Sequence, residues 1–108
     1  MQILVNTGRH VGGGEALESR IRPTIEAALA RFVDRVTRVE VHIDDENSSA
    51  KAGDNDKRCT IEARLAGLKP LSATHQAPSI SLAVDGAAEK LEQAIGRAIG
   101  RLEERRPR

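Results

Sequence analysis

Residues that could carry catalytic or metal chemistry are few and scattered along this sequence of 108 residues. The three histidines (His10, His42 and His75) stand in one expected loop and on two expected strands, at no spacing typical of zinc ligands. Cys59 is the sole cysteine. Strand alternation places it inward, where a thiol is more often a small hydrophobic group than a nucleophile. The sequence therefore predicts solvated or core-edge histidines, no catalytic residue and no cofactor.

Two other patterns are weak signals for ligand binding. The triple glycine at 12–14 lacks the Lys-Ser/Thr that follows it in a phosphate-binding loop. The acidic cluster at 44–46, followed by Asp54 and Asp56, could bind a hard cation. It lacks the loop spacing and the bidentate glutamate of a typical calcium site. No metal site is predicted.

Basic side chains fall into rows on two expected helices. With residues laid out at about 100° each, one flank of the second helix carries four cations. They are Lys90, Arg97, Arg101 and Arg105. The opposite flank of this helix carries Glu89, Glu92 and Glu103. The first helix has a shorter basic row, which consists of Arg20, Arg31 and Arg35.

These rows have a spacing that suits a nucleic-acid backbone. Arginines one or two helical turns apart lie roughly 6 to 10 Å from each other, close to the step between successive phosphates. Such a row would follow a backbone without reading bases. If the two helices lie side by side on a sheet, their rows could border one groove. The alternative is that these are ordinary solvated flanks of surface helices.

The elements that must position these rows follow from hydrophobic periodicity. Alternating apolar residues predict strands at 38–44, 58–65 and 71–75, and a short apolar stretch predicts another at 2–6. Apolar residues three and four apart predict an amphipathic helix from residue 15 to 36, which Pro23 either kinks or begins. The segment 79–84 fits a strand or a helix. Helical phase continuous with Leu91 and Leu102 favours one helix over about 80–102, which Pro78 is expected to open.

This order of elements, β-α-β-β-β-α, predicts an α+β fold in which a four-stranded sheet carries both helices on one face. The length suits a single domain over residues 1–108. The polar segment 45–57 is expected to be a mobile loop, and 103–108 a basic tail. The open sheet face is expected to display polar residues, namely Arg38, Glu40, His42, Thr60, Glu62 and Arg64.

Composition removes several classes of function. Phe32 is the only aromatic residue, so an exposed aromatic platform for stacking bases is excluded. The net charge of +1 does not by itself indicate a nucleic-acid partner. The lone cysteine fits a reducing compartment, and no apolar run approaches the roughly 20 residues of a membrane span. A cytoplasmic protein is expected.

Three segments of the sequence resemble one known family: VTRVEVHI, KRCTIEARLAG and VDGAAEKLEQAIGRAIGRL. The chain resembles the short ribosome hibernation promoting factors and ribosome-associated inhibitor A proteins, once labelled sigma-54 modulation proteins. The similarity extends over about residues 2–102. The pattern departs at Ser81, where typical members carry a tyrosine, and at Gln93, where they carry a basic residue.

The resemblance implies a fold similar to a double-stranded-RNA-binding domain. It also implies a stress-response function: binding to the small ribosomal subunit and its rRNA, in the channel for mRNA and tRNA, with inhibition of translation. Arg35, Lys90, Arg97 and Arg101 match basic positions of the family pattern, whereas Arg20, Arg31 and Arg105 are added from the helical rows. Because the sequence stops at Arg108, we expect it to lack the further domain by which long members pair two ribosomes.

Two alternatives remain beside a ribosome-binding protein. The first is a protein-interaction or self-association module that keeps the fold without binding rRNA; outward-facing basic rows would argue against it. The second is an enzyme that uses Asp44, Glu46 or His42 on the open sheet face, which the lack of a catalytic pattern disfavours. No membrane or small-molecule partner is predicted, and the sequence leaves the oligomeric state open.

Overall fold

The structure is a computed structural model that describes residues 1–8, 14–45 and 56–104. Its elements are, in chain order, β1 (Gln2–Thr7), α1 (Glu15–Ala28), the short 3₁₀ turn η1 (Ala30–Phe32), β2 (Val36–Asp45), β3 (Lys57–Leu65), β4 (Leu71–Ala77) and α2 (Ile80–Glu104). The expected β-α-β-β-β-α order and α+β class are confirmed.

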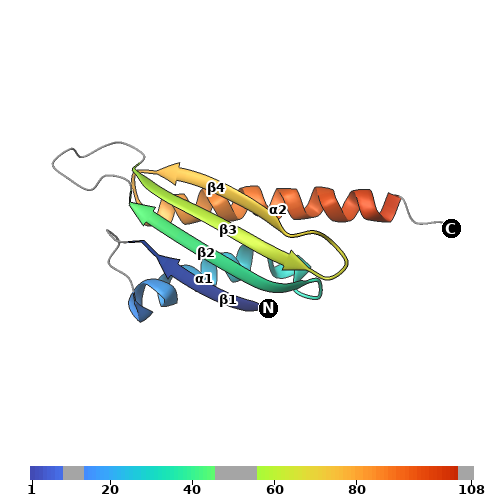
Figure 1. Cartoon of the computed structure of the whole chain (residues 1–108), viewed down its shortest axis with the longest axis horizontal. Helices are drawn as coiled ribbons and strands as arrows, with labels where there is room; N and C mark the ends of the chain where they lie inside the picture. Colours follow the sequence, from blue (N-terminus) through green and yellow to red (C-terminus); the bar gives the residue numbers. More distant parts are fainter. Residues whose placement is uncertain (9–13, 46–55, 105–108) are drawn as a thin grey trace.

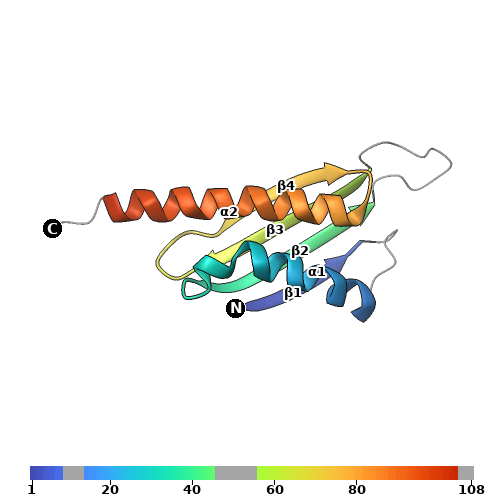
Figure 2. The ribbon, with the colours of Figure 1, turned by 180° about the vertical axis from the view of Figure 1, so that it is seen from behind.

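The four strands form one mixed sheet in the order β1-β2-β3-β4. β1 is parallel to β2, whereas the β2–β3 and β3–β4 pairs are antiparallel. A parallel pair needs a crossover connection, which α1 supplies. Both helices cover the same face of the sheet (Figures 1 and 2), where α2 packs on β3 and β4 and lies beside α1. The C-terminal turns of α2 extend past the β3–β4 turn.

The hydrophobic core lies between the sheet and the helices. Period-two alternation turns one set of side chains on β2 and β3 toward the helices. These side chains are Val39, Val41, Ile43, Cys59, Ile61 and Ala63, each at most 1% exposed. Leu91 and Ile95 of α2 and Ile25 of α1 are completely buried against them. The burial of each helix on one stripe leaves its flanks for charged residues.

The first helix is shorter than the sequence predicts. It begins at Glu15 and continues through Pro23, but ends at Ala28, not at Val36. Phe32 is buried in η1 and Val36 is buried in β2, whereas Val33 is 52% exposed. The apolar spacing from residue 29 to 36 mimics a helix, but a tight turn followed by a strand satisfies it. Pro23 does not begin the helix, because the helix starts before this residue and continues through it.

The second helix is continuous from Ile80 to Glu104, as expected. Its start differs in detail, because Pro78 precedes the helix by two residues. Ser79 caps it instead: the Ser79 hydroxyl accepts the Leu82 N–H at 3.2 Å, and the Ser79 carbonyl accepts the Ala83 N–H at 3.0 Å. A serine side chain at this position satisfies an N–H that the first turn leaves free.

The expected mobile loop at 45–57 is bounded differently. Asp45 ends β2 and Lys57 begins β3, and these two residues are paired across the strands. The Lys57 ammonium lies 3.0 Å from Asp56 and 3.3 Å from Asp45. The hydrogen bond to Asp56, followed by that to Asp45, raises the pKa of Lys57. The interior of the expected loop, 46–55, lies outside the described residues, as do the glycines at 12 and 13 and His10.

Candidate nucleic-acid interface

One exposed flank of α2 carries a line of cations toward the β4 side of the molecule. We call Lys90, Arg97 and Arg101 the α2 basic row. The Lys90 ammonium donates to the main-chain carbonyl of Thr74 on β4 at 3.2 Å. Arg101 faces the β3–β4 turn and the start of β4, where Lys69 and Leu71 line the same pocket from the other side. Arg97, one helical turn before Arg101, is exposed. The expected grouping of these three residues on one flank is therefore seen.

The charges of the α2 basic row are not neutralised by the carboxylates around them. Within the described ranges, none of its three residues makes an ion pair. From Lys90 to Arg101 the helix rises about 16 Å, enough to meet several phosphates of a strand that follows it. The row can therefore attract a polyanion without first breaking internal ion pairs.

The basic row of the first helix does not share a groove with the α2 basic row. Arg31, on η1, meets the other flank of α2, where its Nε lies 3.7 Å from a carboxylate oxygen of Glu92. The Arg31 guanidinium also stacks over the Phe32 ring, 4.5 Å from its centroid. The prediction that the two rows border one groove is therefore wrong for Arg31. The flank of α2 that faces α1 is its acidic one.

The other predicted RNA-binding residues are spread more widely. Arg20 is exposed on α1. Arg35 is half-buried between η1 and β2, and its carbonyl accepts the Ala66 N–H of the β3–β4 turn at 2.9 Å. Arg105, with the rest of the expected basic tail after Glu104, lies outside the described residues. No contact joins Arg20 to the α2 basic row in the part of the chain that the structure describes.

Two residues matter to this surface although sequence reasoning did not select them. Lys69 stands in the β3–β4 turn and adds a cation across from Arg101. Gly96 gives Arg31 room to lie across α2: a Cβ at position 96 would stand 3.1 Å from the Arg31 Nη2. Neither residue has a periodic signal, because each acts through a neighbour on a different element.

The open face of the sheet is less suited to a polyanion, because it carries carboxylates among its cations and some of these charges pair. The Arg38 guanidinium donates to Glu40 at 2.8 Å, and His42 lies 4.0 Å from the same carboxylate. The Thr60 and Thr74 hydroxyls share a hydrogen bond of 2.9 Å across β3 and β4. This face combines both signs of charge, whereas the α2 basic row carries only one.

Catalytic and metal candidates remain without support. Burial raises the pKa of the Cys59 thiol to about 12, which removes the thiolate that a nucleophile needs. Among residues 1–8, 14–45 and 56–104, no group of three or more His, Cys, Asp or Glu side chains is placed to hold a metal ion. Over the same ranges, neither helix combines the length and the apolar character needed to cross a bilayer.

Comparisons with solved structures agree on the fold. The N-terminal domain of Protein Y from Thermus thermophilus superposes with a TM-score of 0.71 at 18% identity, over 90% of this chain and 98% of that one. A ribosomal subunit interface protein from Coxiella burnetii gives a TM-score of 0.66 at 20% identity, over 93% and 99% of the two chains. A search of curated protein sequences finds no significant match.

The sequence itself matches one protein family over nearly its whole length. The match covers residues 4–103, from β1 to the last turn of α2, and so includes every described element that carries the α2 basic row. The resemblance seen in the three sequence segments is confirmed. The chain belongs to the sigma 54 modulation protein / S30EA ribosomal protein family, a family of ribosome-associated factors.

Proposed function

We propose that this chain is a cytoplasmic hibernation factor that binds the small ribosomal subunit in the channel for mRNA and tRNA and thereby inhibits translation. The whole chain, residues 1–108, would act as one binding domain. Membership of the S30EA ribosomal protein family supports the ribosome as partner. A structural neighbour described as a ribosomal subunit interface protein supports a position between the subunits.

The observation that carries this proposal is the α2 basic row. Its three cations lie on one exposed flank and make no ion pair with a carboxylate of the described residues. rRNA offers closely spaced phosphates, and the release of counterions on binding favours such an unpaired row. Lys90, Arg97 and Arg101 would therefore provide the main contacts. Arg20, Arg31, Arg35 and Arg105 would add weaker or peripheral ones.

In this proposal the protein acts by occupancy, not by catalysis. It would fill a site that mRNA and tRNA need, so inhibition should be stoichiometric with ribosomes. Phosphate contacts would fix its position without reading sequence. Arg31, on η1, is paired with Glu92 on the other flank of α2, so it would contribute less than the α2 basic row.

The test is co-sedimentation with ribosomes from stationary-phase cells and with separated subunits. Changing both Arg97 and Arg101 to Glu should abolish pelleting with the small subunit while the protein stays folded, because both side chains lie off the apolar stripe. Arg64→Glu is a control that reverses one charge on the far face of the sheet, where the side chain is exposed. It should pellet as wild type does.

A second outcome would redirect the assignment. If the Arg97→Glu, Arg101→Glu protein still pellets and still inhibits translation in a cell-free assay, the α2 basic row is not the interface. Failure of the wild-type protein to pellet at all would favour the alternative of a protein-interaction or self-association module. The separation of the two basic rows is the observation that keeps that alternative open.

A further inference from the structure

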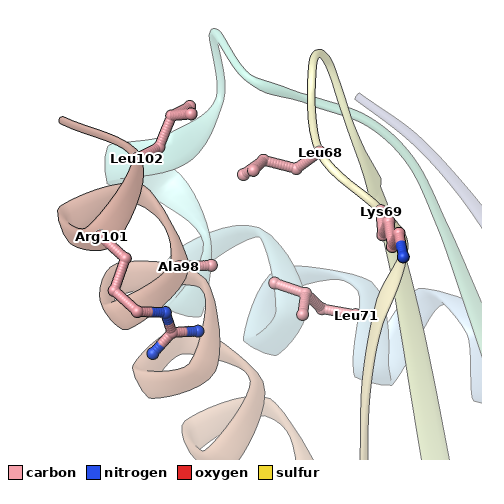
Figure 3. A pocket seen from close by; sticks show the side chains of 6 residues that line it. All are labelled: Leu68, Lys69, Leu71, Ala98, Arg101 and Leu102. Atoms are coloured by element: carbon pink, nitrogen blue, oxygen red, sulfur yellow. The ribbon is translucent and has the colours of Figure 1, made fainter. Parts of the chain in front are cut away.

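An apolar pocket opens between the β3–β4 turn and the last turns of α2 (Figure 3). It has a volume of about 230 Å³. Leu68 of the turn and Leu71 of β4 line one side, and Ala98 and Leu102 of α2 line the other. The three leucines are only partly buried, so they leave apolar surface exposed to water. Covering this surface would be favourable by the hydrophobic effect. We call it the turn pocket.

The charged groups of the turn pocket are all cations. Lys69 and Arg101 line it from opposite sides, and none of the described residues that line it carries a carboxylate. An ammonium and a guanidinium can only donate hydrogen bonds. The pocket thus fits a ligand with an apolar body and an anion on each side of it. An unstacked nucleotide base between two phosphates has this form.

The pocket is continuous with the α2 basic row, because Arg101 belongs to both. An RNA strand that follows the row from Lys90 toward Arg101 reaches the pocket near the C-terminal end of α2. An acidic peptide could also place an apolar side chain between carboxylates. It would need further carboxylates at regular steps of about 6 to 10 Å to match the rest of the row. A nucleic-acid backbone supplies these phosphates at every residue.

We propose that the turn pocket accepts one unstacked base of a single RNA strand, whose flanking phosphates bind Arg101 and Lys69. This inference rests on the proposed function and adds a base contact to the backbone contacts of the row. The leucines would cover the base, in place of the aromatic rings that single-strand binders use. Because none of the described side chains that line the pocket is a hydrogen-bond acceptor, the pocket should accept different bases.

The experiment measures binding of a fluorescent oligoadenylate of about 12 nucleotides and of a matched strand that lacks all bases. Ala98→Leu fills the pocket and keeps both cations. It should weaken binding of the oligoadenylate by about fivefold, since the loss of roughly 40 Å² of covered apolar surface corresponds to that factor. The strand without bases should bind wild type and Ala98→Leu equally.

Two further variants keep the test interpretable. Gly100→Leu adds the same side chain at a position of α2 with no atom within 4 Å, and should bind the oligoadenylate as wild type does. Leu102→Glu places a carboxylate at the partly exposed rim of the pocket and should also weaken binding. It serves as the test if Ala98→Leu does not fold. Circular dichroism and thermal unfolding establish which variants are folded.

Several results would overturn the base-pocket inference. The first is an oligoadenylate affinity that is unchanged in both Ala98→Leu and Leu102→Glu. The second is a loss of affinity for the strand without bases that equals the loss for oligoadenylate. The third is that wild type does not bind oligoadenylate. Binding of a leucine- and aspartate-rich peptide that Ala98→Leu abolishes, with RNA binding unaffected, would assign the pocket to a peptide.

Ribosome co-sedimentation separates this failure from failure of the proposed function. If the double variant Arg97→Glu, Arg101→Glu no longer pellets with ribosomes while Ala98→Leu binds oligoadenylate as wild type does, only the pocket inference fails. If the double arginine variant pellets with ribosomes as wild type does, the proposed interface itself is wrong.

Discussion

Gly86 of α2 lies directly over the imidazole ring of His75 on β4, so that a Cβ at position 86 would overlap the ring atoms. This contact brings the first half of α2 close to the edge of the sheet. It sets the side of the helix on which Lys90, one turn later, reaches the Thr74 carbonyl. A glycine therefore contributes to the orientation of the α2 basic row.

The first prediction concerns this contact. Gly86→Ala should destabilise the protein by about 1–2 kcal/mol, because overpacking costs more than the roughly 1 kcal/mol that alanine gains in helix propensity. Gly100→Ala is the matched control: its Cβ would meet open space, so it should stabilise by about 0.5–1 kcal/mol. Urea unfolding measures both. The loss in Gly86→Ala should largely disappear in a His75→Ala background; if it persists there, the clash with His75 is not its cause.

The second prediction concerns Cys59, which is completely buried on β3. Cys59→Ser should cost about 1–3 kcal/mol, because it leaves a hydroxyl without a partner in an apolar core. Cys59→Ala, which adds no polar atom, should cost less. Chemical denaturation of the three proteins measures the difference. Equal stability of Cys59→Ser and wild type would contradict the packing of β3 against α2.

The third prediction concerns the pH dependence that Cys59 causes. Burial raises its folded-state pKa from 9.0 to about 12. The stabilisation by the neutral thiol is therefore fully present below pH 9.0 and decreases as pH rises toward 12, because only the unfolded thiol ionises in this window. Subtracting the pH profile of Cys59→Ala from that of wild type isolates this contribution. A flat difference profile between pH 9.0 and 12 would show that the thiol is not desolvated.

Much of this fold is predictable from alternation and helical phase. The strands at Val39–Val41 and at Ile61 are recognisable because one face is buried and the other solvated, and α2 because its apolar stripe never changes phase. The end of α1 is not predictable in this way. Phe32 and Val36 have helical spacing, and only the tertiary structure distributes them between a turn and a strand.

The candidate site is predictable only within one element at a time. The helical phase groups Lys90, Arg97 and Arg101, and the structure keeps them together. Which neighbour faces each flank depends on how α2 lies on the sheet, which no pattern within α2 encodes. The Arg31–Glu92 pair and the position of Lys69 across from Arg101 are therefore visible only in the structure.

The fourth prediction concerns the salt dependence of ribosome binding. Each of Lys90→Gln, Arg97→Gln and Arg101→Gln should reduce the slope of log affinity against log salt by about 0.7 to 0.9 for every phosphate that the variant no longer neutralises. Arg64→Gln, on the opposite face of the sheet, should leave the slope unchanged. Co-sedimentation across a salt series measures it. Equal slopes in all four variants would mean that the α2 basic row meets no phosphate.

The last prediction concerns the ion pair between Arg31 and Glu92. Both side chains are partly exposed, 64% and 37%, and their closest N–O distance is 3.7 Å. Such surface pairs are worth about 0.2–1 kcal/mol, so they compete only weakly with a phosphate. If Arg31 contacts rRNA, Glu92→Gln should strengthen ribosome binding, by at most about fivefold, since the arginine no longer leaves a partner.

Removing any negative charge near rRNA also favours binding, so the control must carry the same change. Glu89→Gln removes an exposed carboxylate from the same flank, and Arg31 does not pair with it among the described contacts. The excess of Glu92→Gln over Glu89→Gln is the effect of the pair. In an Arg31→Gln background the two changes should become equal, because the coupling energy of a contacting pair vanishes when either partner is absent. If the excess survives there, the ion pair is not its cause and Arg31 is not an rRNA contact.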